Sequence, residues 1–281
     1  MVPRSRNATE ALEPRKRDAV TENARGLSRR LRLVSAALSR LGRRSPWIEP
    51  EVEGLDHHVN RGDVCVDVGA EYGLYTVVLA AITGPTGRVV AVEPHPSLAR
   101  WLTLVARVLR IEAVTVVDAA LSDSPGSTEL SVPRRNFLPV HGRSYVLSGA
   151  SNDGANTEFS TSRLSTVRMQ TLDEMCRSNQ LNKVHFVKAD VEGAELAVLH
   201  GGIGVLRESR PTVLVEIEQR HLDRYDRKVN DIVDFLGNEG YSMHAWTGSR
   251  WTPTSTITTA RRNYLFVHKH SETARITKGT E

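Results

Sequence analysis

Short apolar runs alternate with amphipathic runs over most of the chain. The apolar runs are rich in Val, which predicts strands buried on both faces, whereas the amphipathic runs repeat every three to four residues and predict helices. This alternation is typical of an α/β fold with a parallel sheet and right-handed crossovers. The expected strands lie near 64–68, 88–92, 114–118, 184–188 and 212–217, and the expected helices near 74–82, 97–110, 194–207 and 228–238.

Two segments depart from this alternation. Residues 241–246 and 264–268 predict two further strands that form a hairpin with a long connection. Residues 131–167 are rich in Ser, Asn, Gly and Arg and predict a long loop, which is either a substrate-facing lid or a disordered segment. Any solvated loop carries polar residues, but four of them in this loop are candidates for binding a polar substrate: His141, Arg143, Tyr145 and Arg163.

Positive charge is concentrated at the N-terminus. Residues 1–45 hold 12 Lys+Arg and 4 Asp+Glu, a net charge of +8, so the rest of the chain has a net charge of −4. Residues 24–44 predict an amphipathic helix, whose apolar face either packs on this protein or a second subunit, or lies on an anionic lipid surface. We therefore expect a basic leader at 1–45, one domain at 46–268 and a polar tail at 269–281.

Composition limits the class of protein. With 40% hydrophobic residues the chain can build a sizeable core, and its two cysteines, Cys65 and Cys176, suggest neither a disulfide framework nor a zinc site. No apolar run approaches the roughly 20 residues of a membrane span, and the N-terminus lacks the apolar segment of a secretory signal. We expect a cytoplasmic protein, with peripheral contact at the inner membrane surface as the alternative. The acidic remainder argues against nucleic-acid binding.

A glycine-rich turn follows the first expected strand. Gly69 and Gly73 lie four residues apart, where a cofactor can approach the backbone closely, and the second strand ends at Glu93, an acid that can bind ribose hydroxyls. The G-x-G-x-x-G pattern of nicotinamide-binding loops is absent. Asp67 at the strand end suits the ammonium or sulfonium group of S-adenosylmethionine better than a pyrophosphate. A tight turn that binds nothing is the structural alternative.

A second polar set follows the fourth expected strand. Lys188 and Asp190 point to the same side of that strand. Because open α/β sheets bind ligands beyond the carboxyl ends of their strands, Asp190 is expected to face substrate or methionine. Helix capping is the alternative for Asp190, Glu192 and Glu195, and pairing with Glu216 is the alternative for Lys188. Carboxylates at one edge can also hold Mg²⁺, which the spacing does not establish, and no metal ligand is assigned.

Together these motifs resemble the FkbM family of S-adenosylmethionine-dependent methyltransferases over residues 63–267. The family usually has Asn at the position of Glu71 and a hydrophobic residue at that of Ala189. The resemblance implies a class I methyltransferase-like (Rossmann-like), doubly wound, mostly parallel seven-stranded sheet with an N-terminal helical extension, in which residues 264–268 form an antiparallel insertion at the sheet edge. The segments that carry it are 66–73, 92–96, 118–123, 171–173 and 187–195.

This resemblance implies that the cofactor is S-adenosylmethionine. Asp67 and Gly69 are expected to face its methionine moiety, Glu93 its ribose, and Asp118, through its side chain or the adjacent backbone, its adenine. The full set expected to bind the cofactor is Asp67, Gly69, Glu71, Gly73, Glu93, Asp118 and Ala120.

The expected reaction is in-line transfer of a methyl group to a hydroxyl of the acceptor. The family resemblance suggests a secondary metabolite, a polysaccharide or a glycolipid sugar as acceptor. Asp190 is the first candidate for the general base and His221 the second, with Lys188 completing the catalytic set. Two rival functions stay open: a nicotinamide-dependent oxidoreductase, and a scaffold protein that binds S-adenosylmethionine without consuming it.

Overall fold

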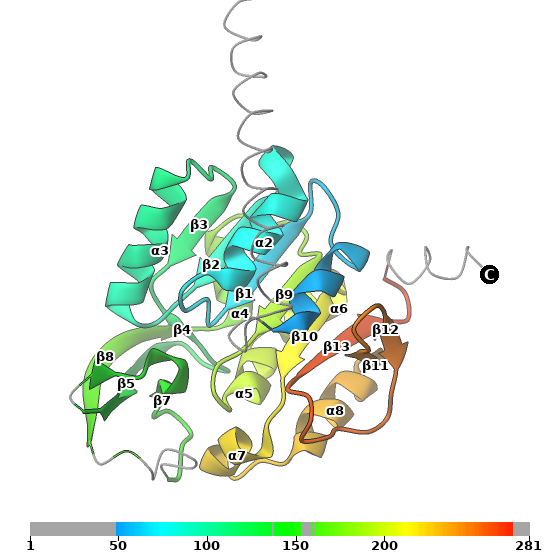
Figure 1. Ribbon diagram of the computed structural model, residues 1–281. Coiled ribbons are helices and arrows are strands. Elements are labelled where there is room, and N and C mark those ends of the chain that lie inside the picture. Colours follow the sequence, from blue (N-terminus) through cyan, green and yellow to red (C-terminus); the bar gives the residue numbers. More distant parts are fainter. Residues whose placement is uncertain (1–48, 137, 153–158, 160, 272–281) are drawn as a thin grey trace, which may run out of the picture.

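The computed structural model describes residues 49–136, 138–152, 159 and 161–271 (Figure 1). Among these residues the main sheet has eight strands in the order β12-β11-β13-β10-β9-β1-β2-β3. The five strands from β10 to β3 are parallel. The chain runs outward from β1 to β3 and then returns to place β9 beside β1, so strand order reverses between β1 and β9. Ligands bind at such a reversal in open α/β sheets.

The parallel strands occur where the apolar runs predict them. Their bounds are β1 Val64–Val68, β2 Arg88–Val92, β3 Val114–Val117, β9 Phe186–Ala189 and β10 Thr212–Glu216.

The C-terminal part of the sheet is antiparallel. β11 (Tyr241–Trp246) and β13 (Asn263–His268) pair with each other, which confirms the predicted hairpin. β12 (Trp251–Pro253) pairs with the outer side of β11 and makes the sheet one strand wider than the seven expected. The antiparallel insertion predicted at residues 264–268 is confirmed, but its position at the sheet edge is wrong, because β13 lies between β11 and β10 and pairs with both.

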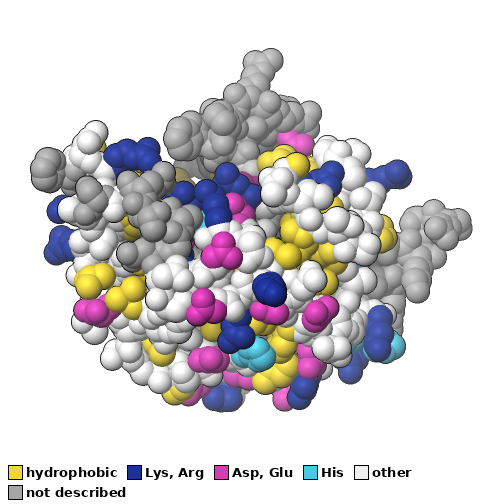
Figure 2. Space-filling view, turned by 90° about the horizontal axis from the view of Figure 1, so that it is seen from below, with side chains coloured by type: hydrophobic (Ala, Val, Ile, Leu, Met, Phe, Trp, Pro, Cys, Tyr) yellow, Lys and Arg dark blue, Asp and Glu magenta, His cyan; other side chains and the backbone are white. Residues whose placement is uncertain are grey.

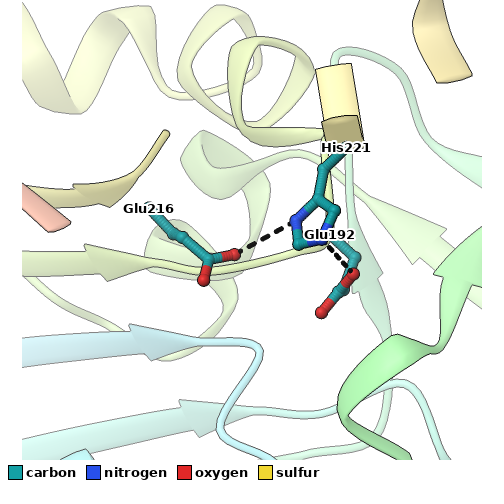
Figure 3. Close-up of side chains that lie close together, drawn as sticks. All are labelled: Glu192, Glu216 and His221. Atoms are coloured by element: carbon teal, nitrogen blue, oxygen red, sulfur yellow. Dashed lines mark ion pairs between the residues drawn. The ribbon is translucent and has the colours of Figure 1, made fainter. Parts of the chain in front are cut away.

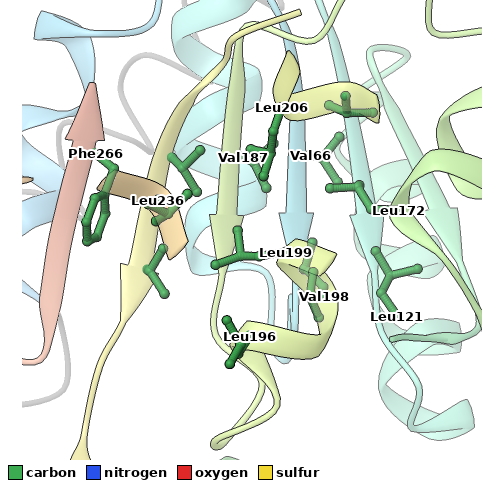
Figure 4. Close-up of a cluster of buried hydrophobic side chains, with 14 of the residues drawn as sticks. Val66, Leu121, Leu172, Val187, Leu196, Val198, Leu199, Leu206, Leu236 and Phe266 are labelled. Carbon is green, nitrogen blue, oxygen red and sulfur yellow. The ribbon is translucent and has the colours of Figure 1, made fainter. Parts of the chain in front are cut away.

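Helices cover both faces of this sheet. One face carries η1 (Pro50–His57), α2 (Leu74–Thr83) and α3 (Pro96–Val108), and the other carries α4 (Leu172–Ser178), α5 (Glu195–His200), α6 (Ile203–Glu208) and α8 (Val229–Asn238). Successive residues of a strand point to opposite faces. Cys65 of β1 therefore packs in the core beneath α2, while Val66 packs with Leu172 and Leu199 in the core on the other face (Figure 4).

The predicted helix at 194–207 is two helices, α5 and α6, separated by Gly201 and Gly202. A Cβ atom at Gly201 would lie 2.0 Å from the carbonyl oxygen of Ser122, and one at Gly202 would lie 2.5 Å from the Leu172 side chain. The chain therefore bends where two neighbouring segments come too close for a side chain. Helix α4, which was not predicted, begins at a capping box formed by Thr171 and Glu174.

The predicted loop at 131–167 is wrong in part, because its described residues contribute to a second sheet. The strands are β4 Ala120–Leu121, β5 Gly126–Arg135, β6 Leu138–Pro139, β7 Tyr145–Val146 and β8 Thr161–Gln170. β5 and β8 pair antiparallel from Gly126 opposite Met169 to Arg134 opposite Thr161. Six of the ten residues of β8 are exposed and all of these but Leu164 are polar, so the apolar signal of the side chains facing the core, such as Val167 and Met169, is weak.

Short single-turn elements complete the described chain: η2 Gly84–Thr86, η3 His141–Arg143, α7 Gln219–Leu222 and η5 Asp223–Tyr225. Both cysteines are buried and free. The predicted helix at 24–44 lies outside the described residues, as does most of the tail expected at 269–281. No helix in the described ranges is both long and apolar enough to cross a bilayer.

Candidate active site

A cavity of about 400 Å³ lies beyond the carboxyl ends of the parallel strands. Residues at the ends of β1, β2, β9 and β10 line one side, and residues of η3 and β7 line the other. The second sheet lies below the ends of β1 and β2, near α5 (Figure 1), and the cavity lies between the two sheets. Seen from this side, acidic, basic and histidine side chains mix on the surface (Figure 2).

Gly69 forms the floor of the cavity at the end of β1. Its φ of 79° is in the left-handed region, and a Cβ atom there would lie 1.8 Å from the carbonyl oxygen of Asp190. Gly73, with a φ of 88°, precedes the first residue of α2 and is not among the lining residues. The turn between β1 and α2 therefore packs directly against the chain that leaves β9, which only glycine at position 69 permits.

Glu93 follows β2 and is buried next to this turn. Its carboxylate accepts the backbone N–H of Glu71 at 2.9 Å and that of His95 at 2.8 Å. Burial raises the pKa of Glu93 to about 7, against the effect of these two N–H groups. Glu71 also lines the cavity, and burial followed by the charges of Asp190 and Glu49 raises its pKa to about 7. The Glu93 carboxylate therefore fixes the backbone at Glu71.

Three predicted cofactor residues take different positions. Asp67 is buried and not among the lining residues, and its carboxylate accepts the Thr76 hydroxyl at 2.5 Å. Burial raises the pKa of Asp67 to about 6. Asp118 is exposed and also outside the lining, whereas Ala120 and its neighbour Ala119 line the cavity. Direct contact of Asp67 or Asp118 with a cofactor stays a prediction, and the residues after β3 that line the cavity are Ala119 and Ala120.

Asp190 lies at the end of β9, beside Gly69, with its side chain 28% exposed. The Lys188 ammonium lies 2.8 Å from its Oδ2 atom and 4.8 Å from the centre of the Tyr75 ring. Burial alone would lower the pKa of Lys188, but the charges of Asp190, Glu49 and Glu216 outweigh it and raise the pKa. For Asp190, burial would raise the pKa, but the Lys188 charge and hydrogen bond lower it. Asp190 is therefore ionised and lines the cavity, and Lys188 lies behind it.

His221 follows β10 and lies between two carboxylates (Figure 3). Its Nε2 atom is 3.2 Å from Glu192 Oε2, and its Nδ1 atom is 3.4 Å from Glu216 Oε2. Burial lowers the pKa of His221 to about 4, and burial followed by the charge of Asp190 raises the pKa of both glutamates well above the usual range. All three residues line the cavity, and Arg143 of η3 reaches across to within 3.0 Å of His221 Nε2.

Other polar residues divide between structural and cavity positions. Glu195 accepts the backbone N–H groups of Val191 and Gly193, so it fixes the turn after β9 and does not line the cavity. His141, Arg143 and Tyr145 line the cavity, and Arg163 does not.

Glu49 and Arg262 also line the cavity, although the sequence gave no sign of either. Glu49 precedes η1 in chain order, and Arg262 immediately precedes β13. Neither adjoins a recognised motif, so only the folded chain brings them to this site.

The model of the Methyltransferase FkbM domain matches residues 67–243. This match covers most of the chain, so the protein belongs to the FkbM methyltransferase family, as the resemblance implied. No curated protein sequence matched the chain.

Several solved methyltransferase structures are similar to the chain. The FkbM methyltransferase of Methylobacillus flagellatus is 17% identical with a TM-score of 0.46, over 78% of this chain and 50% of that one. The chain thus spans about half the length of that protein. Fibrillarin of Aeropyrum pernix, solved with S-adenosyl-L-methionine, is 17% identical over 75% of this chain and 68% of that one, with a TM-score of 0.42. A Streptococcus mutans putative methyltransferase is 10% identical over 79% of this chain and 98% of that one, with a TM-score of 0.44.

Proposed function

We propose that the protein transfers a methyl group from S-adenosylmethionine to a hydroxyl of a polar acceptor. The observation that carries this proposal is the packing of Gly69 on the Asp190 carbonyl oxygen, with a distance of 1.8 Å to an added Cβ atom. This packing puts a glycine-floored cofactor turn and an ionised carboxylate side by side in one cavity. This arrangement suits methyl transfer, because methyl donor and acceptor must meet in line.

The residues at the ends of β1 and β2 fit S-adenosylmethionine. Gly69 leaves room for a ligand against the backbone, and buried Glu93 has acceptor capacity left for ribose hydroxyls beyond its two backbone N–H partners. Ala119 and Ala120 offer a small apolar wall where the resemblance predicts adenine. When bound, S-adenosylmethionine supplies a methyl group activated by its sulfonium.

The residues at the ends of β9 and β10 fit the acceptor. Asp190 is ionised, lines the cavity and can accept the proton of the attacking hydroxyl. Lys188 does not line the cavity and acts as a positioning residue that fixes the Asp190 carboxylate at 2.8 Å. The mixture of Glu192, Glu216, His221 and Arg143 around this carboxylate favours an acceptor with several hydroxyl groups, since each of these groups can bond one.

Two measurements test the proposed function. Calorimetry should show binding of S-adenosylmethionine to the full chain, and cells with and without the protein should differ in a metabolite or lipid by the mass of one methyl group. Once the acceptor is known, Asp190→Asn should lower turnover by about 100-fold with little change in cofactor affinity. Glu239→Gln, which changes a surface pair with Arg207, is the matched control.

Binding of S-adenosylmethionine without any methylated product would favour the scaffold function instead, and binding of a nicotinamide dinucleotide alone would overturn the proposal. The glycolipid acceptor and lipid contact through residues 24–44 are further proposals. Sedimentation with anionic vesicles tests the lipid contact, and equal binding by the chain without residues 1–45 would contradict it.

A further inference from the structure

The carboxylates and imidazole of Glu192, Glu216 and His221 form a cluster with incomplete bonding. One ligating atom from each residue lies within 4.8 Å of the other two. Among the described residues, Glu192 Oε2, Glu216 Oε2 and His221 Nδ1 are buried atoms without a hydrogen-bond partner. Glu216 is 5% exposed and His221 2% exposed, and both side chains point toward one another (Figure 3). The two Oε2 atoms lie 3.2 and 3.4 Å from the ring nitrogens of His221 as ion pairs, but these contacts are not hydrogen bonds. Leaving buried polar atoms without hydrogen bonds is costly, which indicates that a ligand completes them.

A second acidic group nearby does not share this property. Glu49, Asp190 and Glu216 also lie within 4.8 Å of one another. The Glu49 carboxylate, however, accepts the Tyr75 hydroxyl at 2.5 Å, and Asp190 accepts the Lys188 ammonium at 2.8 Å. These two acids already have partners of the right charge or polarity, so the incomplete bonding is concentrated at the Glu192, Glu216 and His221 cluster.

We propose that Glu192, Glu216 and His221 bind a divalent cation at the acceptor side of the cavity. Two carboxylates and one imidazole suit a first-row ion such as Mn²⁺, because carboxylates favour Mg²⁺, Ca²⁺ and Mn²⁺ whereas imidazole favours transition metals. The three residues line the cavity, so the remaining coordination positions would face the acceptor. The role of this cation rests on the proposed function: the cation would orient acceptor oxygens beside Asp190.

The imidazole nitrogen that binds the cation is Nδ1. This atom faces Glu216 Oε2 at 3.4 Å, whereas Nε2 lies 3.0 Å from an Arg143 guanidinium nitrogen. A guanidinium only donates, so without the cation Nε2 accepts from Arg143 and the ring proton is on Nδ1, and binding of the cation at Nδ1 moves this proton to Nε2. Binding of the cation at Nδ1 therefore also breaks the Arg143 contact at Nε2. Arg143 nevertheless places a positive charge near the cation. Removing this charge by Arg143→Gln should therefore tighten cation binding.

The test is a titration of the full chain with Mn²⁺, in the absence of cofactor and acceptor, after treatment with a chelator and desalting. Electron paramagnetic resonance measures the free Mn²⁺. We expect one saturable site per chain, at least about 10-fold weaker binding by Glu216→Gln and by His221→Gln, and unchanged binding by the control Glu239→Gln. Should Glu216→Gln fail to fold, Glu192→Gln, whose side chain is 14% exposed, replaces it.

Three outcomes would overturn the cation site: no saturable binding up to about 1 mM Mn²⁺, equal binding by the wild type and all cluster variants, or weaker binding by Arg143→Gln. Calorimetry with S-adenosylmethionine on the same samples separates this result from the proposed function. Cofactor binding without Mn²⁺ binding would refute only the cation site, and Mn²⁺ binding without cofactor binding would refute only the methyltransferase proposal.

Discussion

The Nζ atom of Lys188 lies 2.8 Å from Oδ2 of Asp190, at the end of the strand that returns beside β1. Lys188 is 1% exposed, and its charge is balanced inside the protein by Asp190 and, at longer range, by Glu49 and Glu216. The pair therefore links the buried centre of the sheet to the candidate site.

Replacing Lys188 by Met should destabilise the fold by about 3 kcal/mol at neutral pH. Removing one partner of a buried pair typically costs about 3–5 kcal/mol, and the 28% exposure of Asp190 places this case at the lower end. Denaturant unfolding measures the change. The double variant Lys188→Met with Asp190→Asn is the control, because it removes both charges and should recover part of the loss. If Lys188→Met is as stable as the wild type, the Lys188–Asp190 pair does not stabilise the fold.

Replacing Gly69 by Ala should destabilise the protein and remove cofactor binding. The φ of 79° alone costs an Ala residue about 1–2 kcal/mol, and the 1.8 Å approach of its Cβ to Asp190 O adds to this. Gly237→Ala is the matched control, because an added Cβ there has no neighbour within 4 Å and its helix should gain about 0.5–1 kcal/mol. Thermal unfolding of both variants, with calorimetry of S-adenosylmethionine, gives the comparison. If Gly69→Ala binds the cofactor as tightly as the wild type, the cofactor does not lie close to the backbone at position 69.

Replacing Glu93 by Gln should weaken S-adenosylmethionine binding by about 10-fold, because an amide accepts the ribose hydroxyls less strongly than a carboxylate. The pKa of Glu93 is raised to about 7 by burial, so its ionised form increases between pH 6 and 8. Wild-type affinity should accordingly rise with pH over this range, while the affinity of the variant stays constant. Calorimetry at several pH values checks both, and a flat wild-type profile would refute the ribose assignment.

Replacing Glu71 by Asn should stabilise the protein. Glu71 has a φ of 48°, which Asn adopts more readily, so we expect a gain of about 0.5–1 kcal/mol at any pH. Burial also raises the pKa of Glu71 from its usual 4.5 to about 7, so its stabilising contribution is complete below pH 4.5 and lost as pH rises to 7. At pH 8, Glu71→Asn should therefore raise the free energy of unfolding by about 1–3 kcal/mol in total.

Glu71→Gln separates these two effects, because it removes the charge and keeps the backbone strain. It should match the wild type near pH 4.5 and exceed it at pH 8. Denaturant unfolding of the protein without cofactor over this range is the measurement, and a Gln profile parallel to that of the wild type would show that the charge has no effect.

Local chemistry was sufficient to predict most of the main sheet. The Val-rich runs ending at Val68, Val92 and Glu216 are strands, because a strand buried on both faces must be apolar along its whole length. The glycines at 69 and 73 adopt the positive φ that their turn requires. The same-side placement of Lys188 and Asp190 followed from the two-residue repeat of a strand, and the 2.8 Å pair confirms it.

Tertiary structure alone decided the rest. β5 and β8 are polar on their exposed side, so their pairing is stabilised by backbone hydrogen bonds and one narrow core that no local pattern reveals. Glu49 and Arg262 reach the cavity from distant parts of the chain. The Glu192, Glu216 and His221 cluster likewise depends on β9 and β10 being neighbours, because the sequence specifies which residues can ionise but only packing fixes the distances and burial that determine how they interact.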